Sequence, residues 1–215
     1  MDLEGGVRGQ DQKRVRDRGK EGWKKNGTAG VITVVLAVAA LIGWREWQGH
    51  QGEQSSEASK QYQVMVEALT AQQVDEAAVN KQAEALKDDF PGSAYAGYAT
   101  LAQARLAVQA GEYDKAASLL QDVADNGATD ALTYTARLRL VRVLLQQQAY
   151  DKAAAELDHS FPAAFNGMAL ELRGDLAKAR DDQQAATEAY TQALETLQDN
   201  GEKDRVQMKL DDLKS

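Results

Sequence analysis

The chain has 215 residues and a mass of 23.4 kDa, which is enough for one or two domains with a sizeable core. Hydrophobic residues make up 43% and charged residues 27%, with only two prolines, a balance that excludes wholly disordered, collagen-like and Pro-rich chains. The absence of cysteine excludes disulfides, Cys-ligated zinc and a thiol nucleophile, and the formal net charge of -8 argues against a nucleic-acid binder.

The N-terminal tail and the rest of the chain carry opposite charge. Residues 1–25 contain eight Lys and Arg side chains and five acidic ones, a net charge of +3. Residues 45–215 carry 17 basic and 28 acidic side chains, a net charge of -11. We interpret residues 1–25 as a cytoplasmic tail that touches anionic lipid.

An uncharged apolar run follows the basic tail. It extends from Asn26 to Trp44, 19 residues without an ionisable group, and as a helix it would be about 28 Å long, close to the hydrocarbon thickness of a bilayer. All three tryptophans, Trp23, Trp44 and Trp47, bracket this run, as is typical of the headgroup region of a membrane. The pattern predicts a transmembrane helix over residues 26–47.

Two other interpretations of the apolar run remain open. A cleavable signal peptide could be cut at Ala37-Val38-Ala39, although this site lies inside the run, and the run could also be a buried core helix. In the membrane interpretation, eight Lys and Arg residues precede the run and only two occur in the 20 residues after it. This asymmetry predicts that the N-terminus lies in the cytoplasm and that the acidic part lies across the membrane.

From residue 45 onward the composition predicts helices. This part is rich in Ala, Gln, Leu and Glu, and it contains both prolines. Turn signals recur about every 35 to 40 residues, a period typical of arrays built from two-helix repeats. The signals are Asp89-Phe90-Pro91-Gly92-Ser93, Asp125-Asn126-Gly127, Ser160-Phe161-Pro162 and Asp199-Asn200-Gly201.

Small residues set the register of the repeats. Ala116, Ala153 and Ala186 each lie near the start of a predicted helix, 37 and then 33 residues apart. The predicted inward positions are Ala116, Leu120 and Val123, then Ala153, Leu157 and Ser160, then Ala186, Tyr190 and Ala193. In the preceding helices the predicted contact positions are Ala104 and Ala107, Val141 and Leu144, and Gly174 and Ala177. This arrangement resembles the tetratricopeptide pattern, in which small residues allow paired helices to approach closely.

The predicted fold class is therefore all-α, with an N-terminal transmembrane helix followed by a tetratricopeptide-like helical solenoid. Residues 48–96 are expected to form an N-terminal helical hairpin or degenerate repeat, since residues 54–88 indicate two helices but match the repeat poorly. Residues 97–215 are expected to hold the tetratricopeptide-like repeats and a C-terminal helix.

The candidate binding surface is the concave face of the solenoid, formed by outward positions of the first helix of each repeat. Its expected members are Tyr98, Leu101, Arg105, Arg142, Leu145, Met168, Glu171 and Lys178. A solvated face explains the charged members equally well. Arg137, Arg139 and Arg142 follow one another along an apolar helix, where we expect them to snorkel to solvent, with an acidic partner for Arg137 as the alternative.

No catalytic, cofactor-binding or metal site is predicted. His50 and His159 are the only histidines, and neither has a ligand-type neighbour at helical spacing. The sequence has no GxGxxG or GxxxxGK[ST] phosphate loop and no GxSxG nucleophile motif. These features favour a binding protein over an enzyme.

Several short strings, in their order along the chain, resemble the YfgM family. They are Leu41-Ile42-Gly43-Trp44-Arg45, Arg137-Leu138-Arg139-Leu140-Val141-Arg142-Val143, Leu172-Arg173-Gly174-Asp175 and Met208-Lys209-Leu210. The resemblance implies a bacterial inner-membrane protein whose helical domain lies in the periplasm. It further implies association with the SecYEG translocon and the periplasmic chaperone PpiD, and it supplies no catalytic residues.

The expected function is that of a membrane-anchored protein-binding scaffold that helps to pass newly exported proteins from the Sec translocon to periplasmic chaperones. Unfolded exported proteins are possible partners in this interpretation, and nucleic acid is not. The alternative is a membrane-tethered adaptor that sequesters a cytoplasmic stress-response regulator through the basic tail. A hydrolase is a third and weaker hypothesis.

Overall fold

The computed structural model describes residues 39–42, 44–45, 52 and 54–213. The chain divides into two units, Met1–Gln54 and Ser55–Ser215. The predicted cytoplasmic tail and most of the predicted transmembrane helix lie outside the described residues, and residues 39–42 and 44–45 are helical. Among the residues that are described, no helix combines the length and the apolar character needed to cross a membrane.

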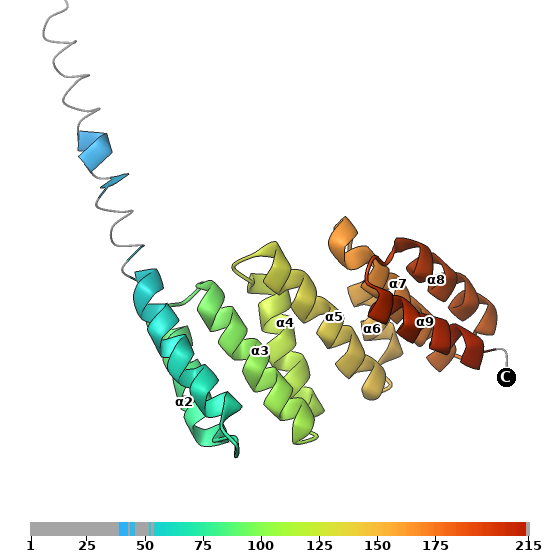
Figure 1. Ribbon diagram of the computed structural model, residues 1–215, viewed down its shortest axis with the longest axis horizontal. Coiled ribbons are helices and arrows are strands. Elements are labelled where there is room, and N and C mark those ends of the chain that lie inside the picture. Colours follow the sequence, from blue (N-terminus) through green and yellow to red (C-terminus); the bar gives the residue numbers. More distant parts are fainter. Residues whose placement is uncertain (1–38, 43, 46–51, 53, 214–215) are drawn as a thin grey trace, which may run out of the picture. The chain divides into compact units, whose positions relative to one another are not determined.

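The second unit is built from helices, and the described residues confirm the predicted all-α helical array (Figure 1). A first helix covers residues 54–70. The helices that follow are α2 (Glu76–Asp89), α3 (Ala94–Gln109), α4 (Tyr113–Asn126), α5 (Asp130–Gln146), α6 (Tyr150–Leu157), α7 (Ala163–Ala179), α8 (Gln183–Thr196) and α9 (Asn200–Asp212).

Each helix packs against the next one along the chain, and alternate helices also touch. The chain-order contacts run from α2 to α6 and from α6 through α7 and α8 to α9, and direct contacts join α3 to α5 and α5 to α7. Helices α3, α5 and α7 therefore form one row of the array. This is the row from which the candidate binding surface was predicted.

Short polar side chains begin several of the helices at the predicted turns. The Ser93 hydroxyl accepts a hydrogen bond from the Ala96 amide at 3.1 Å, and Thr129 and Asp199 cap α5 and α9 in the same way. Such caps satisfy amides that have no partner inside the helix. The predicted turn signals thus fall between helices or at their ends.

The turns inside the repeats share one backbone conformation. Gly111, Gln148 and Asp181 have φ values of 76°, 58° and 60°, in the left-handed region. They occupy equivalent places between α3 and α4, α5 and α6, and α7 and α8. In each turn the following amide donates to a carbonyl near the end of the preceding helix, at Ala107, Leu144 or Ala177. The three turns are therefore one structural motif repeated.

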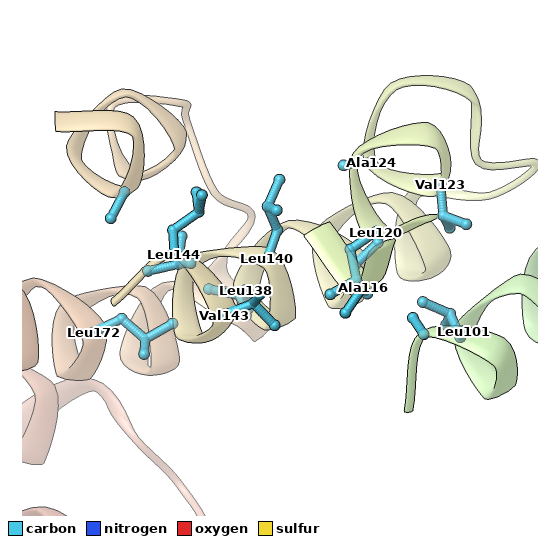
Figure 2. Close-up of a cluster of buried hydrophobic side chains, with 14 of the residues drawn as sticks. Leu101, Ala116, Leu120, Val123, Ala124, Leu138, Leu140, Val143, Leu144 and Leu172 are labelled. Atoms are coloured by element: carbon cyan, nitrogen blue, oxygen red, sulfur yellow. The ribbon is translucent and has the colours of Figure 1, made fainter. Parts of the chain in front are cut away.

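The central core confirms most of the predicted inward positions. Ala116, Leu120 and Val123 of α4 are buried against side chains of α3 and α5, as Figure 2 shows for the labelled residues. Ala153 and Leu157 are buried as well, and so are Ala186, Tyr190 and Ala193. The prediction for Ser160 is wrong: α6 ends at Leu157, and Ser160 is exposed in the loop before Pro162.

Two smaller apolar clusters lie on either side of the central one along the chain. The first joins the helix over residues 54–70 and α2 to α3, through Met65, Val79, Leu86 and Leu106 among others. Residues 54–88 thus contain the two expected helices. The second smaller cluster joins α7, α8 and α9 around the fully buried ring of Tyr190.

Candidate functional site

The predicted surface residues lie on α3, α5 and α7 as expected, but they differ in exposure. Arg105, Arg142 and Lys178 are exposed, and Tyr98 is 43% exposed. Leu145 and Met168 are half-buried and pack against the central cluster.

Two members of the predicted surface are buried, contrary to the expectation that they face outward. Leu101 is 6% exposed because it belongs to the central apolar cluster. Glu171 is 2% exposed because α9 lies over it and supplies basic partners. The sequence pattern placed both on the outer face because it gave no sign of what covers them.

A groove lies between α3 and α5, with α4 beneath it. Leu101, Arg105 and Val108 line it from α3, and Arg139, Arg142 and Val143 line it from α5. Leu120 of α4 also contributes to the lining, and the groove has a volume of about 290 Å³. Both lining stripes follow helical spacing, so a single face of each helix builds the groove.

The charged side chains of this groove are all arginines. Burial lowers the pKa of Arg139, and the neighbouring positive charges of Arg142 and Arg105 lower it further. Within the described part of the chain, none of the three guanidinium groups forms an ion pair or a side-chain hydrogen bond. They therefore concentrate positive charge on an otherwise acidic protein.

The other four arginines of residues 54–213 all have partners. Arg137 is 6% exposed, forms an ion pair with Glu156 and donates to the carbonyl of Ala124 at 3.2 Å. Arg173 donates to the carbonyl of Leu157. The remaining two, Arg180 and Arg205, pair with Asp151 and Glu171.

For Arg137 the expectation of a snorkelling side chain is wrong, and the alternative of an acidic partner is confirmed. The guanidinium lies in the contact between α5 and α6, where a buried charge must be paired. Arg139 and Arg142, on the other side of α5, do reach the groove surface. The three-residue spacing of Arg139 and Arg142, together with Arg105 on α3, is the signal that could have marked the groove.

A polar network fixes α9 to α7. Arg205 donates two hydrogen bonds to the carboxylate of Glu171, at 2.9 and 2.7 Å, and Lys209 donates to the same carboxylate at 2.7 Å. Lys209 also pairs with Asp175, whose carboxylate accepts from the Tyr190 hydroxyl at 2.7 Å. This network was missed from the sequence because the pairs that join α9 to α7 lie 34 to 38 residues apart.

The network changes the acidity of its members. Burial acts to raise the pKa of Glu171, but the hydrogen bonds from Arg205 and Lys209 outweigh it and lower the pKa to about 2. The pKa of Tyr190 is raised by burial and by the hydrogen bond to Asp175. Glu171 is thus a structural anion held by α9, and its carboxylate is already occupied.

The remaining described residues bring no histidine or metal-ligand cluster together. His159 is exposed, and His50 lies outside the described residues. Across the described positions no group of three or more His, Asp or Glu side chains could hold a metal ion. The arginine groove is the feature best suited to contact another molecule.

Comparison with known proteins identifies relatives of this chain. A family described as "Tetratricopeptide repeat-like domain" matches residues 20–215. A curated relative from Neisseria gonorrhoeae (strain ATCC 700825 / FA 1090) is 38% identical over 137 residues, which are 63% of this chain and 66% of that protein. A relative from Haemophilus influenzae (strain ATCC 51907 / DSM 11121 / KW20 / Rd) is 32% identical over 177 residues, 82% and 85% of the two chains.

Both relatives carry the name "Ancillary SecYEG translocon subunit". No solved structure matches this chain. The family match supports the tetratricopeptide-like character that the repeat register predicts, and it includes all of the described helices of the array.

Proposed function

Because this chain belongs to the YfgM family of tetratricopeptide repeat-like proteins, we propose that it is an ancillary subunit of the SecYEG translocon. The observation that carries the proposal is the 32% identity to a translocon subunit over 82% of the chain. The helical array supports a scaffold role, since such arrays bind other proteins through their extended surfaces.

The proposal includes a membrane anchor and a periplasmic array. Residues 26–47 would anchor the chain, with the basic tail in the cytoplasm, as the charge asymmetry around the apolar run favours. Tethering beside the translocon raises the effective concentration of the array near emerging chains, so individual contacts can be weak. In this role the array would help to pass newly exported proteins to a PpiD-like chaperone.

Photocrosslinking in intact membranes tests the partners. A photoreactive residue at Tyr98, Arg142 or Lys178, all exposed on the row of first helices, should capture SecYEG subunits and a PpiD-like chaperone. Glu195 on α8 is the matched exposed control outside this row. Equal capture from Glu195, or no capture of translocon subunits from any position, would contradict the proposal.

Three further experiments test the anchor and the alternative. Alkaline carbonate should leave the full-length chain in the membrane pellet, and a reporter fused after Ser215 should be active in the periplasm. Deleting residues 2–22 should leave translocon capture unchanged. Loss of the main partner on that deletion would instead favour the adaptor that sequesters a cytoplasmic regulator.

A further inference from the structure

Pairing divides the arginines of the helical array into two groups. Four of the seven in residues 54–213 bond to a carboxylate or a backbone carbonyl. The three without such a partner in the described structure, Arg105, Arg139 and Arg142, all line the same groove. Their lack of partners is notable because residues 45–215 carry 28 acidic side chains, yet no acidic side chain that the structure describes contributes to the groove lining.

The positive charges of the three guanidinium groups repel one another, and a bound anion would relieve this repulsion. The lowered pKa of Arg139 reflects its partial burial and the repulsion from Arg142 and Arg105. A carboxylate placed among the three would replace repulsion by charge-assisted hydrogen bonds, and guanidinium groups bind carboxylates in a two-point geometry. The electrostatics of the groove therefore favour an anionic occupant.

The floor of the groove adds a second requirement. Leu101, Leu120 and Val143 are buried beneath it, and Val108 lies at its edge with 37% of its surface exposed. The volume of about 290 Å³ is at the lower end of the range for ligand pockets and suits a few side chains. The occupant should thus bring an apolar group together with its negative charges.

We propose that this groove binds a segment of a partner polypeptide in which carboxylate side chains flank an apolar residue. The inference rests on the proposed function, in which the array is a protein-binding scaffold, and it specifies the chemistry of the segment bound. The apolar residue would occupy the floor between α3 and α5, while the carboxylates pair with Arg105 on one side and with Arg139 and Arg142 on the other.

A peptide-binding measurement on the full-length chain tests the proposal. The probe is a fluorescent peptide in which Glu-Leu-Glu triplets are separated by glycine and serine residues. The matched control peptide has Gln in place of every Glu. Fluorescence anisotropy should show binding of the Glu peptide, weaker binding at higher salt, and at least about tenfold weaker binding of the Gln peptide.

Variants assign the binding to the groove. Arg142→Gln and Arg105→Gln should each weaken binding of the Glu peptide by about tenfold, the effect of one lost charge-assisted contact. Lys152→Gln removes an exposed positive charge from α6, outside the groove lining and outside the predicted surface, and should leave binding unchanged. Val108→Thr keeps the side-chain shape but adds a hydroxyl, and it should also weaken binding.

Three results would overturn the proposal. Equal affinity for the Glu and Gln peptides would remove the role of the carboxylates. Equal effects of Arg142→Gln and Lys152→Gln would show only nonspecific attraction. Binding to phosphatidylglycerol vesicles that depends on Arg142, with no peptide binding, would assign the groove to lipid instead.

Circular dichroism provides the folding control, since the arginines concerned have no partner among the described residues and all variants should keep the wild-type melting curve. Translocon crosslinking distinguishes this inference from the proposed function. Peptide binding without translocon capture would contradict the proposed function and leave the groove chemistry intact. Translocon capture that survives Arg105→Gln and Arg142→Gln, without peptide binding, would overturn the groove assignment alone.

Discussion

Single small residues decide how closely paired helices approach. A Cβ atom at Gly174 would lie 2.4 Å from ring carbons of Tyr190, and one at Gly167 would lie 2.6 Å from Leu197. Both contacts are far shorter than van der Waals separation. The glycines of α7 are therefore needed for close approach to α8 and to the segment after it, and not for an unusual backbone conformation.

Gly174→Ala should destabilise the fold by about 1 to 3 kcal/mol, because the added methyl group displaces the buried Tyr190 ring. The measurement is chemical denaturation followed by circular dichroism. The same substitution in a Tyr190→Leu background should cost less or become stabilising, because the ring is gone and Ala has the higher helix propensity. An equal cost in both backgrounds would contradict the steric explanation.

At Glu171 the residue-scale effect is electrostatic. Its carboxylate is buried beneath Arg205 and Lys209, so replacing it with Gln leaves Arg205 without its anion and leaves Lys209 with Asp175 alone. Glu171→Gln should lower the free energy of unfolding by about 3 kcal/mol at neutral pH. Denaturation of the exposed control Glu195→Gln should match the wild type within about 0.5 kcal/mol.

The pH dependence of stability follows from the same carboxylate. The pKa of Glu171 is about 2 in the folded chain and 4.5 ordinarily, so the unfolded chain takes up the proton first as the pH falls. The ionised Glu171 carboxylate contributes fully to the free energy of unfolding above about pH 5, and this contribution is lost progressively toward pH 2. Denaturation across this window should show a flatter profile for Glu171→Gln, and parallel profiles would contradict the assignment.

At the scale of elements, the left-handed position of the repeated turn is occupied by glycine in one turn and by residues with a side chain in the other two. Gly111 adopts its positive φ without a steric penalty, whereas Gln148 and Asp181 carry side chains in the same conformation. The hydrogen bonds from the residues that follow hold all three turns alike. Glycine at the left-handed position of the other two turns should therefore increase the stability of the fold.

Gln148→Gly and Asp181→Gly should each stabilise the chain by about 0.5 kcal/mol, the net of relieved strain and the greater flexibility of glycine when unfolded. Gly111→Ala should destabilise it by about 1 kcal/mol. Ala110→Gly is the control, because Ala110 has a φ of -79° and gains nothing from glycine. Thermal melting curves measure all four, and destabilisation by Gln148→Gly would contradict the argument.

The helices themselves could be predicted because local signals coincide with the packing. Pro91 and Pro162 mark breaks, and Ala116, Ala153 and Ala186 mark the close contacts of successive pairs. The prediction for Ser160 was wrong because α6 ends at Leu157, whereas the pattern of inward positions in the sequence continues to Ser160. Periodicity assigns a face to each residue but does not say where its helix ends.

At the scale of the whole molecule, the candidate surface was only partly predictable. Arg105 and Arg142 do line the groove, since exposed positions of alternate helices meet in a row. Glu171 was misplaced because its exposure depends on α9, which returns to cover α7 from more than 30 residues away. The residues around Glu171 in the sequence do not indicate that a distant helix will cover it. Buried ion pairs between helices far apart in the sequence are therefore easily missed.

Removing α9 should weaken the C-terminal end of the array. A chain ending after Gln198 loses the buried Val206 and Leu210 and leaves Glu171 without its cations. Burial of the two apolar side chains alone is worth on the order of 3 to 6 kcal/mol. A lower melting temperature is expected, with hydrogen exchange rising first in α7 and α8.

A chain ending after Leu213 retains these contacts and is the matched control for the truncation. It should melt as the full chain does. If the shorter chain kept the same melting temperature and the same amide protection in α8, α9 would be an appendage and not part of the C-terminal cluster.

The three apolar clusters make tolerance of sequence change uneven along the array. Helix α3 contributes Leu101 to the central cluster and Leu106 to the N-terminal one, while α7 contributes Leu172 and Leu170 to the central and C-terminal clusters. Substitutions in these two shared helices disturb two neighbourhoods at once. Substitutions in α9 disturb only the cluster formed with α7 and α8. Sequence differences between relatives should therefore be more frequent in the terminal helices of the array than in α3 and α7.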